Sequence, residues 1–555
     1  MLRPVGWKSW KRLPTAEEVR CQAYIAIACR ARGVVYYASC GARSNCASKT
    51  GEPEKLENFG PWDIPEYKES FFKLMRDLGD MESSLVLRDA AEQPKVEILE
   101  GPALNVLGSA SVRCLMKADG LLVAANTSHL PVKAKITTSD GRSIVHSFSR
   151  NGVLADRPVV DETAALQDRI DRVSARGGGR VTLTRGVHDI SSVCLRDDVE
   201  LYLEAGAVLR GSRDPDAYMM DFGGRFWSGK STNRWSNAMI RLLGVKNVSI
   251  VGEPGSVIDG RNCFDATGEE GFRGPHAISA YAVTNLTLRG VQIRDAGNFA
   301  LYTQNAAEVL VEGIVVQGGH DSLDFFGCSN VNVRNCVLHS GDDCIAGYNN
   351  TDLTVRGCDL NTACNLFRIG GNHILVENCW GMAPAENPHR WSLGDAERRL
   401  ERTPVGAGRR TTLSFFTFFT GKSARAVSSD IVFRDCHFSG VEQFMHYNLS
   451  GNERWQCGSG LHDVAFENVH LEGVKHPICA YSNKYAPLRM SFRDSSIAFR
   501  EPVRNLVRGA WIESVDRSGL KVDGVTGPDV RYWDELKPQG ATAEQAAEKF
   551  VETML

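Results

Sequence analysis

Two short acidic runs stand out because their residue types and spacing suit acid–base chemistry. They are GHDSLD at 319–324 and SGDDC at 340–344, and both come where a strand pattern gives way to a turn. Carboxylates held close together repel and raise one another's pKa, so folding alone gives no reason to cluster them. We therefore predict an acid–base site formed by Asp321, Asp342 and Asp343.

The elements that position these acids form a repeat. Strand patterns of the apolar-x-apolar type begin at positions 286, 309, 331, 353 and 374, which are 23, 22, 22 and 21 residues apart. One copy of about 22 residues predicts one coil of a solenoid, stacked on the next at the ~4.8 Å spacing of paired strands. Because Asp321 and Asp342 are 21 residues apart, we expect Asp321 to lie directly above Asp342.

The start of the repeat indicates which solenoid this is. Residues 161–167 begin an amphipathic helix that ends at three glycines, 177–179, and short strands with glycine turns follow. Such a helix can cover the open end of a stack of parallel strands. A leucine-rich repeat has a similar period, but its Leu/Asn signature and its helices are absent from the pattern. We predict a mainly all-β chain with a single-stranded parallel β-helix over residues 151–530 and a helical tail over 531–555.

Residues 1–150 differ from the repeat. Residues 1–90 have a mixed α/β pattern, with a helix after Thr15 and a buried strand at 33–38, and residues 26–37 resemble the last β/α units of a glycosidase-type barrel. Residues 91–150 alternate between apolar and polar side chains, which predicts a small antiparallel β-sandwich with a structural or docking role.

Cysteines recur at one position of the repeat, three residues after the second apolar residue of the strand. They are Cys336, Cys358, Cys379 and Cys436. A metal site would need thiolates that converge, whereas a ladder in register predicts packing of reduced thiols inside the coils. Asn335 and Asn378 precede two of them and predict an amide ladder at a corner of the coil.

The composition excludes some classes of protein. A chain of 555 residues predicts two or more domains. Its net charge of −3 gives no electrostatic case for binding nucleic acid or an anionic membrane.

No apolar run approaches the ~20 residues that span a bilayer. A secretory signal pattern is absent after Met1, which predicts a cytoplasmic protein, or a secreted or periplasmic one if the native start lies elsewhere.

From residue 161 to about 500 the sequence resembles the polygalacturonase-like glycoside hydrolases of family 28, which are right-handed parallel β-helices. The family's Asn-Thr-Asp motif corresponds to residues 319–321, with the later acid kept as Asp324, and its Gly-Asp-Asp-Cys motif is intact at 341–344. Residues 273–290 resemble the family's Arg-Pro segment and the coil before the site. Cys364 or Asn365 stands where the family's Gly-His-Gly motif has histidine, and its Arg-Ile-Lys motif has no match.

The resemblance implies hydrolysis with inversion at the anomeric carbon. Asp342 would be the acid, while Asp321 and Asp343 would hold the attacking water, with carboxyl groups roughly 6.5–9.5 Å apart. Asp324 would bond turn amides. Further residues are expected to contact substrate, either by resemblance or as aromatic platforms for sugar rings: His320, Asn365, Arg368, Arg273, His276, Tyr348 and Tyr447, with Phe325, Phe326 and Trp380 as additional aromatic candidates. Arg368, or an arginine of the excursion at 385–425, would replace the missing grip on a substrate carboxylate.

The expected substrate is a pectin-like or other complex polysaccharide, a uronide or a rhamnoside included, and the resemblance implies no cofactor or metal. Two alternatives stay open. A polysaccharide lyase on the same fold would use the clustered carboxylates to bind Ca²⁺, and a non-catalytic carbohydrate-binding solenoid would not need them charged.

Overall fold

The computed structural model describes residues 15–31, 87–157 except 140, 161–218, 237–263, 273–389, 410–449 except 423 and 425, 455–527 and 530–532, with single residues between 74 and 85. The chain divides into two compact units, Met1–Val160 and Asp161–Leu555. Among the described residues, no helix is both long and apolar enough to cross a membrane.

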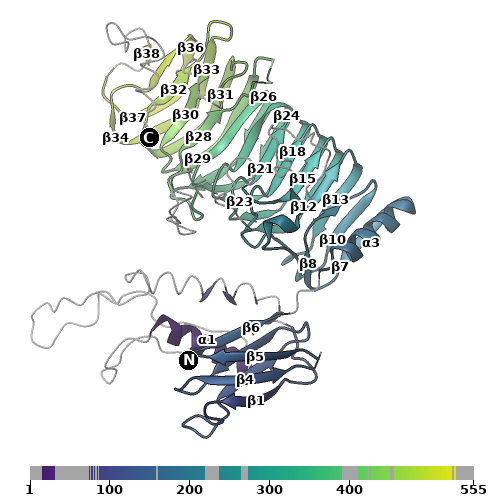
Figure 1. Cartoon of the computed structure of the whole chain (residues 1–555). Helices are drawn as coiled ribbons and strands as arrows, with labels where there is room; N and C mark the ends of the chain where they lie inside the picture. The colour runs from purple at the N-terminus through teal and green to yellow at the C-terminus, as the bar shows by residue number, and fades with distance from the viewer. Residues whose placement is uncertain are drawn as a thin grey trace, which may run out of the picture. The chain divides into compact units, whose positions relative to one another are not determined.

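In the part of the first unit that the structure describes, a helix precedes two small antiparallel sheets (Figure 1). Helix α1 (Ala16–Ala28) begins at Thr15, whose side chain accepts from the Glu18 amide while the Glu18 carboxylate accepts from the Thr15 amide. This reciprocal capping satisfies two amides that the first turn leaves unpaired. The strands are β1 (Lys95–Glu100), β2 (Val112–Met116), β3 (Leu122–Asn126), β4 (Val132–Thr137), β5 (Ser143–Phe148) and β6 (Val153–Asp156).

The two sheets have the orders β1-β4-β5 and β2-β3-β6, and their apolar faces share one core. Alternate residues of β3 point the other way and pack against α1 through Tyr24 and Ile27. The antiparallel strands predicted for residues 91–150 are therefore present. The barrel-like segment predicted before them lies mostly outside the described residues, and the division into four domains stays a prediction.

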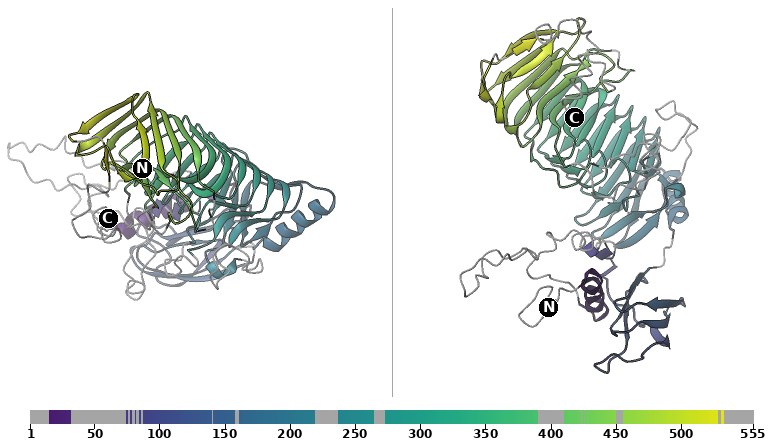
Figure 2. Two further views of the ribbon diagram at one scale, coloured as in Figure 1. Left: turned by 90° about the horizontal axis from the view of Figure 1, so that it is seen from above. Right: turned by 60° about the vertical axis from the view of Figure 1, so that its left-hand side comes forward.

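The second unit is a parallel β-helix, as predicted (Figures 1 and 2). Helix α3 (Thr163–Ala175) lies at its first coil and buries Leu166 and Ile170. A short 3-10 helix, Pro215–Ala217, follows strand β11 (Ala207–Gly211). Each coil contributes strands to three columns, and strands in one column pair in parallel with those of the coils before and after.

The first column carries the acidic runs at the start of its strands. It contains β9 (Val193–Cys194), β12 (Ala238–Leu243), β15 (His276–Tyr281), β18 (Leu301–Gln304), β21 (Leu323–Phe326), the first parts of β24 (Ile345–Arg356) and β26 (Asn365–Glu377), β28 (Ser414–Phe418), β30 (Gln443–Asn448), β32 (Ile478–Tyr481), β35 (Val507–Ala510) and β38 (Val530–Tyr532).

The second column contains β7 (Gly179–Leu183), β10 (Val199–Leu203), β13 (Lys246–Gly252), β16 (Thr284–Arg289), β19 (Ala307–Glu312), β22 (Ser329–Arg334), the later parts of β24 and β26, the first parts of β29 (Ser429–Ser439) and β31 (Asp463–Val474), β33 (Leu488–Arg493) and β36 (Ile512–Asp516).

The third column contains β8 (Gly186–Ile190), β11 (Ala207–Gly211), β14 (Val257–Asp259), β17 (Gln292–Arg294), β20 (Val315–Gln317), β23 (Val337–Ser340), β25 (Asp359–Thr362), β27 (Trp380–Met382), the later parts of β29 and β31, β34 (Ser495–Val503) and β37 (Leu520–Val525).

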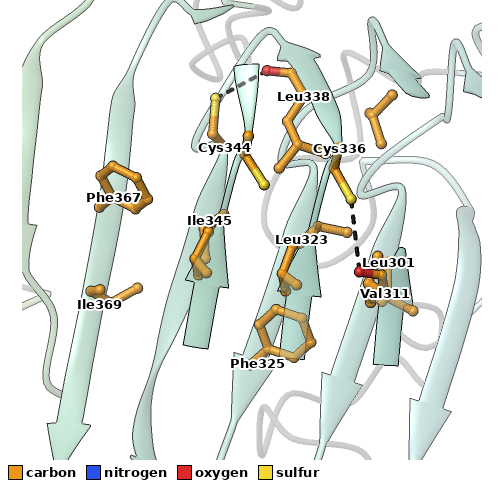
Figure 3. Packing of buried hydrophobic residues seen from close by; sticks show 14 of the residues in the cluster. Leu301, Val311, Leu323, Phe325, Cys336, Leu338, Cys344, Ile345, Phe367 and Ile369 are labelled. Carbon is orange, nitrogen blue, oxygen red and sulfur yellow. Dashed lines mark hydrogen bonds between the residues drawn. The ribbon is translucent and has the colours of Figure 1, made fainter. Parts of the chain in front are cut away.

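Apolar side chains at matching positions of successive coils fill the interior. Figure 3 shows Leu301, Leu323, Ile345 and Phe367 stacked across four neighbouring strands, and the strand pairing puts them in register. Phe325 also points into this core and is fully buried, so it cannot serve as the sugar platform considered from the sequence.

The predicted cysteine column is confirmed, because Cys336, Cys358, Cys379 and Cys436 are all buried in the interior. The Cys336 thiol donates to the Val311 carbonyl at 3.8 Å (Figure 3). A hydrogen bond with Cys358 and burial raise the pKa of Cys336, which keeps it a thiol. These cysteines pack as small apolar groups.

Corner residues adopt left-handed backbone angles. Asn335 and Asn378, which the repeat pattern placed at a corner, have φ of 55° and 53°, and Gly313 takes the equivalent place one coil earlier with φ of 60°. Asparagine and glycine tolerate this region better than other residues. Their recurrence at one point of the coil therefore reflects the sharp turn between the second and third columns.

Candidate active site

The acidic corner comes just before the first column, where the chain enters β21 and β24. The Ser322 amide donates to the Asp343 carbonyl at 2.9 Å, and Leu323 pairs with Ile345. This register is a 22-residue step, which puts Asp321 beside Asp343 in the next coil. The expectation that Asp321 lies directly above Asp342 is wrong by one residue. Asp342 instead neighbours His320, whose carbonyl accepts from the Asp342 amide at 3.2 Å.

Asp321 and Asp324 form a buried carboxyl pair. They are 5% and 1% exposed, and each lies close enough to the other to affect its ionisation. Burial and the neighbouring carboxylates raise the pKa of Asp321 well above its usual range. Burial and Asp343 do the same to the pKa of Asp324. The predicted role of Asp324 in bonding turn amides is wrong, since its side chain belongs to the acid cluster.

Asp342 lies next to nitrogen groups of histidine and arginine, whereas Asp321 lies next to other carboxyl groups. His389 Nε2 lies 3.3 Å from Asp342 Oδ2, and His320 Nδ1 and Arg273 Nη1 each lie 3.9 Å from the same oxygen. Burial acts to raise the pKa of Asp342, but the two histidines and the arginine outweigh it and hold that pKa well below its usual range. The structure thus brings His320 and Arg273 to Asp342. Both were expected to contact substrate, but the His320 side chain is fully buried, so that expectation is wrong for His320.

Asp343 is fully buried and has a cation of its own. Arg368 Nη1 donates to Asp343 Oδ2 at 3.0 Å, while the backbone and side-chain amides of Asn365 donate to Oδ1 at 3.1 and 2.6 Å. The Arg368 guanidinium also lies over Phe419 and Trp455, with its carbon 4.1 and 5.2 Å from the ring centroids.

These contacts change the roles expected of Arg368 and Asn365. Burial acts to lower the pKa of Arg368, but Asp343 outweighs it and raises that pKa, so the guanidinium stays charged and paired with Asp343. The Asn365 Oδ1 accepts from Ser414 and Thr417 at 2.8 and 2.9 Å. Both residues therefore position Asp343, and the proposed grip of Arg368 on a substrate carboxylate is not supported.

Aromatic side chains form a cluster on the outer side of the first column beside Arg368. Tyr348 and Trp455 are only partly buried there, so of the aromatic candidates in this cluster Tyr348 keeps the partly exposed side chain that a sugar platform needs. The cluster contains Phe299, Tyr302, Phe326, Phe419, Tyr348 and Trp455.

Three other candidates are not placed to meet a substrate. His276 is fully buried, stacks on Tyr302 and accepts the Phe299 amide. Tyr447 is fully buried in the core, where its hydroxyl bonds Ser482. Trp380 is exposed but lies on β27, in the third column. The predictions for His276 and Tyr447 are therefore wrong, because burial removes both from contact with a ligand.

The residues that sequence reasoning missed are His389 and Trp455. His389 lies in the excursion after β27, and Trp455 follows β30, so neither falls on the repeat period that located the acids. Their proximity to Asp342 and Arg368 depends on where each loop folds back. For His389, the only signal in the sequence was the length of the excursion at 385–425.

Asp342, Asp343 and Cys364 are the described residues whose potential metal ligands lie within 4.8 Å of one another. Calcium prefers six to eight oxygen ligands. Here one ligand is sulfur, and the two carboxylates already contact His389 and Arg368. This donor set fits the Ca²⁺ of the lyase alternative poorly.

Comparison with known proteins finds a family match for the part of the chain that contains the acidic corner. Residues 210–363 match the model of glycosyl hydrolases family 28. This confirms the resemblance and the prediction of a glycoside hydrolase. The matched segment contains Asp321, Asp342 and Asp343, whereas Arg368 and His389 lie beyond its end.

Solved structures of similar proteins include three polygalacturonases. The family 28 exopolygalacturonase of Yersinia enterocolitica is 16% identical, with 75% of this chain and 83% of that chain covered and a TM-score of 0.48. The exopolygalacturonase of Thermotoga maritima is 15% identical, with coverages of 67% and 88% and a TM-score of 0.45. The polygalacturonase of Erwinia carotovora is 12% identical, with coverages of 68% and 95% and a TM-score of 0.42. No curated protein gave a significant match.

Proposed function

We propose that the protein hydrolyses glycosidic bonds of a pectin-like or other complex polysaccharide by acid–base catalysis with inversion. The observation that carries the proposal is the unequal environment of two acids in one cluster: Asp321 is buried beside the carboxyl groups of Asp324 and Asp343, whereas Asp342 faces two histidines and an arginine. Glycoside hydrolysis needs one protonated carboxyl and one carboxylate at the same bond.

The chemistry follows from these two states. The protonated carboxyl gives its proton to the glycosidic oxygen as the bond to the anomeric carbon breaks. The carboxylate takes a proton from a water molecule, whose oxygen attacks that carbon from the opposite face. Asp343, held by Arg368 and Asn365, provides a second carboxylate to orient the water.

Two assignments of the roles are compatible with this scheme. The family resemblance makes Asp342 the proton donor and Asp321 part of the pair that holds water. The electrostatics without substrate favour the reverse, because the pKa of Asp321 is raised and the pKa of Asp342 is lowered. In either assignment both residues are required, which is the part of the proposal that mutation tests first.

The test is hydrolysis of uronide, rhamnoside and galactoside oligosaccharides by the wild type and by Asp342→Asn and Asp321→Asn. We expect each variant to lose about 10³-fold in kcat, the usual contribution of a positioned acid or base. Asp352→Asn is the matched control, because Asp352 lies on β24 but is exposed and paired with His373. NMR of the fresh product should show the inverted anomer.

A nitrophenyl leaving group separates the two roles, since it departs without protonation. The variant that lacks the donor should then recover most of its rate, and the variant that lacks the base should not. An unsaturated, ultraviolet-absorbing product would identify a lyase instead. If Asp342→Asn and Asp321→Asn both retained full activity, the proposal would be wrong.

A further inference from the structure

A short segment after β27 carries His389 to the acids. Residues 383–389 leave the third column, and at their end His389 Nε2 lies 3.3 Å from Asp342 Oδ2. The segment passes close to the backbone beside Asp342, because a Cβ built on Gly341 would lie 2.5 Å from the Pro388 carbonyl oxygen. We call residues 383–389 the His389 segment. Whatever holds this segment also sets the distance from His389 to Asp342.

Asn361 bonds the start and the middle of the His389 segment through one side chain. It lies on β25, in the third column, and is 6% exposed. Its Nδ2 donates to the Met382 and Pro384 carbonyls at 2.7 and 3.2 Å, and its Oδ1 accepts from the Glu386 amide at 2.7 Å. A shorter side chain at this position would leave these backbone groups without that partner, which costs free energy where water is excluded.

Other contacts to the His389 segment involve exposed residues. The Ala385 amide donates to the Arg410 carbonyl at 2.9 Å, and Arg410 Nη1 donates to the Ala385 carbonyl at 3.1 Å. His339 Nδ1 lies 2.9 Å from Glu386 Oε2. Arg410 and Glu386 are both exposed, and ion pairs at the surface contribute little to stability. The buried Asn361 is therefore the stronger anchor.

We propose that Asn361 is a positioning residue for the acids, because by holding the His389 segment on the third column it keeps the His389 imidazole against Asp342. The effect on catalysis rests on the proposed function, whereas the contact between His389 and Asp342 does not. Asn361 would act on Asp342 through His389 and would meet no substrate. Part of the electrostatics of the acidic corner is then set from a strand of another column.

The other ionisable groups around Asp342 come from residues 273–364 and not from the His389 segment. They are His320, Arg273, Asp321, Asp324, Asp343 and Cys364. Loss of the Asn361 side chain should therefore move His389 and leave these groups in place. Because His389 is one of the groups that hold the pKa of Asp342 down, the pKa of Asp342 should rise when the segment is released.

NMR of protein with ¹⁵N-labelled histidine tests the contact without a substrate. The His389 imidazole signal is identified by its loss in His389→Gln. In the parent, Asp342→Asn should shift this signal, and in Asn361→Ala the same change should shift it by less than half as much. If Asn361→Ala does not fold, Asn361→Asp replaces it, because this variant keeps the acceptor for the Glu386 amide and loses both donated bonds. A full response to Asp342→Asn in the folded variant would overturn the inference.

Asn350→Ala is the matched control. Asn350 is also buried and also bonds two backbone groups, the Phe325 carbonyl at 2.8 Å and the Cys328 amide at 3.0 Å. It lies on β24 after the first-column part of that strand, away from the His389 segment. Both asparagine variants should lower Tm, but only Asn361→Ala should weaken the response of His389 to Asp342→Asn. An equal weakening in Asn350→Ala would mean a general loss of structure and would overturn the inference.

Kinetics test the consequence for catalysis. In Asn361→Ala, the limb of the kcat/KM profile that reports Asp342 should move to higher pH by most of the shift that His389→Gln produces. In the double variant, Asn361→Ala should add no further shift, because it acts through the group already removed. Additive shifts would contradict action through His389. A coupled His389 signal together with no hydrolysis of any oligosaccharide by the wild type would instead contradict the proposed function and leave the positioning role of Asn361 in place.

Discussion

Asp321 and Asp342 show how the same side chain acquires opposite properties from its neighbours. Burial and the neighbouring Asp324 raise the pKa of Asp321 and favour its protonated form, whereas Asp342 faces His389, His320 and Arg273, which favour its carboxylate. A pKa difference of one unit corresponds to ~1.4 kcal/mol between the two protonation states. The division of labour in the site therefore depends on residues that carry out no proton transfer themselves.

His389→Gln tests this dependence. Removing the imidazole takes away one of the groups that hold the pKa of Asp342 down, so that pKa should rise toward its ordinary value. The limb of the pH profile of kcat/KM that reports Asp342 should move to higher pH by the same amount. If Asp342 is the donor this is the alkaline limb, and if it is the base it is the acidic limb.

His373→Gln is the control for that measurement, because His373 is 63% exposed and pairs with Asp352, away from the acids. It should leave both limbs in place. An unmoved profile in His389→Gln, with only a lower rate, would mean that His389 acts through packing.

Asp324→Asn should stabilise the folded protein by an amount that depends on pH. The folded protein holds the Asp324 proton to higher pH than the unfolded chain does, so this residue destabilises the fold as pH rises from about 4 through its folded pKa. The variant should therefore gain about 2 °C in Tm at pH 8 and little at pH 4. A gain of the same size at both pH values would contradict a raised pKa of Asp324 in the folded protein.

Whether a site residue could be predicted from the sequence depends on whether that residue lies on the repeat. Asp321, Asp342 and Asp343 were found because their motifs are local and contiguous. Tyr447 and His276 were placed wrongly, because a one-residue change of parity moves a strand residue between solvent and core. His389 was missed because the path of an excursion is set by tertiary packing.

At the scale of the element, each coil is defined by its length and its corners. The strand pattern located the coils from the sequence, and the cysteine column and left-handed asparagines confirmed their register. The coil at the site has 22 residues, whereas Asp321 and Asp342 are 21 residues apart. Spacing between acids is therefore a weaker guide to register than the hydrogen bonds of the strands themselves.

Comparing Gly347→Ala with Gly313→Ala separates the effect of close contact between coils from the effect of a left-handed backbone conformation. Both glycines have positive φ, but a Cβ at Gly347 would lie 1.6 Å from the Phe325 carbonyl oxygen, whereas one at Gly313 would meet nothing within 4 Å. We expect Gly313→Ala to cost about 1 kcal/mol in the free energy of unfolding. Gly347→Ala should cost at least about 3 kcal/mol, because backbone must move.

Thermal unfolding of both variants measures the difference, and activity at low temperature adds a second readout. Gly347 precedes Tyr348, so a shift of β24 should also lower kcat, while Gly313→Ala should leave it unchanged. Equal losses of stability in the two variants would mean that the coils separate easily, contrary to their paired register.

At the scale of the whole molecule, the candidate acids of the second unit gather at one corner of the β-helix. They lie just before β21 and β24, in neighbouring coils. A solenoid places side chains at fixed intervals along such a corner because each coil adds one strand spacing. The sequence predicted the stack of coils and located the acids on it.

The parallel pairing of successive coils has a consequence for how related chains diverge. One residue inserted within a strand would turn every later side chain of that strand from interior to exterior, while an insertion at the corner before the first column is absorbed outside the ladder. Length differences among descendants of this chain should therefore accumulate at that corner, so that preference for a particular glycan can change while the carboxylates stay where they are.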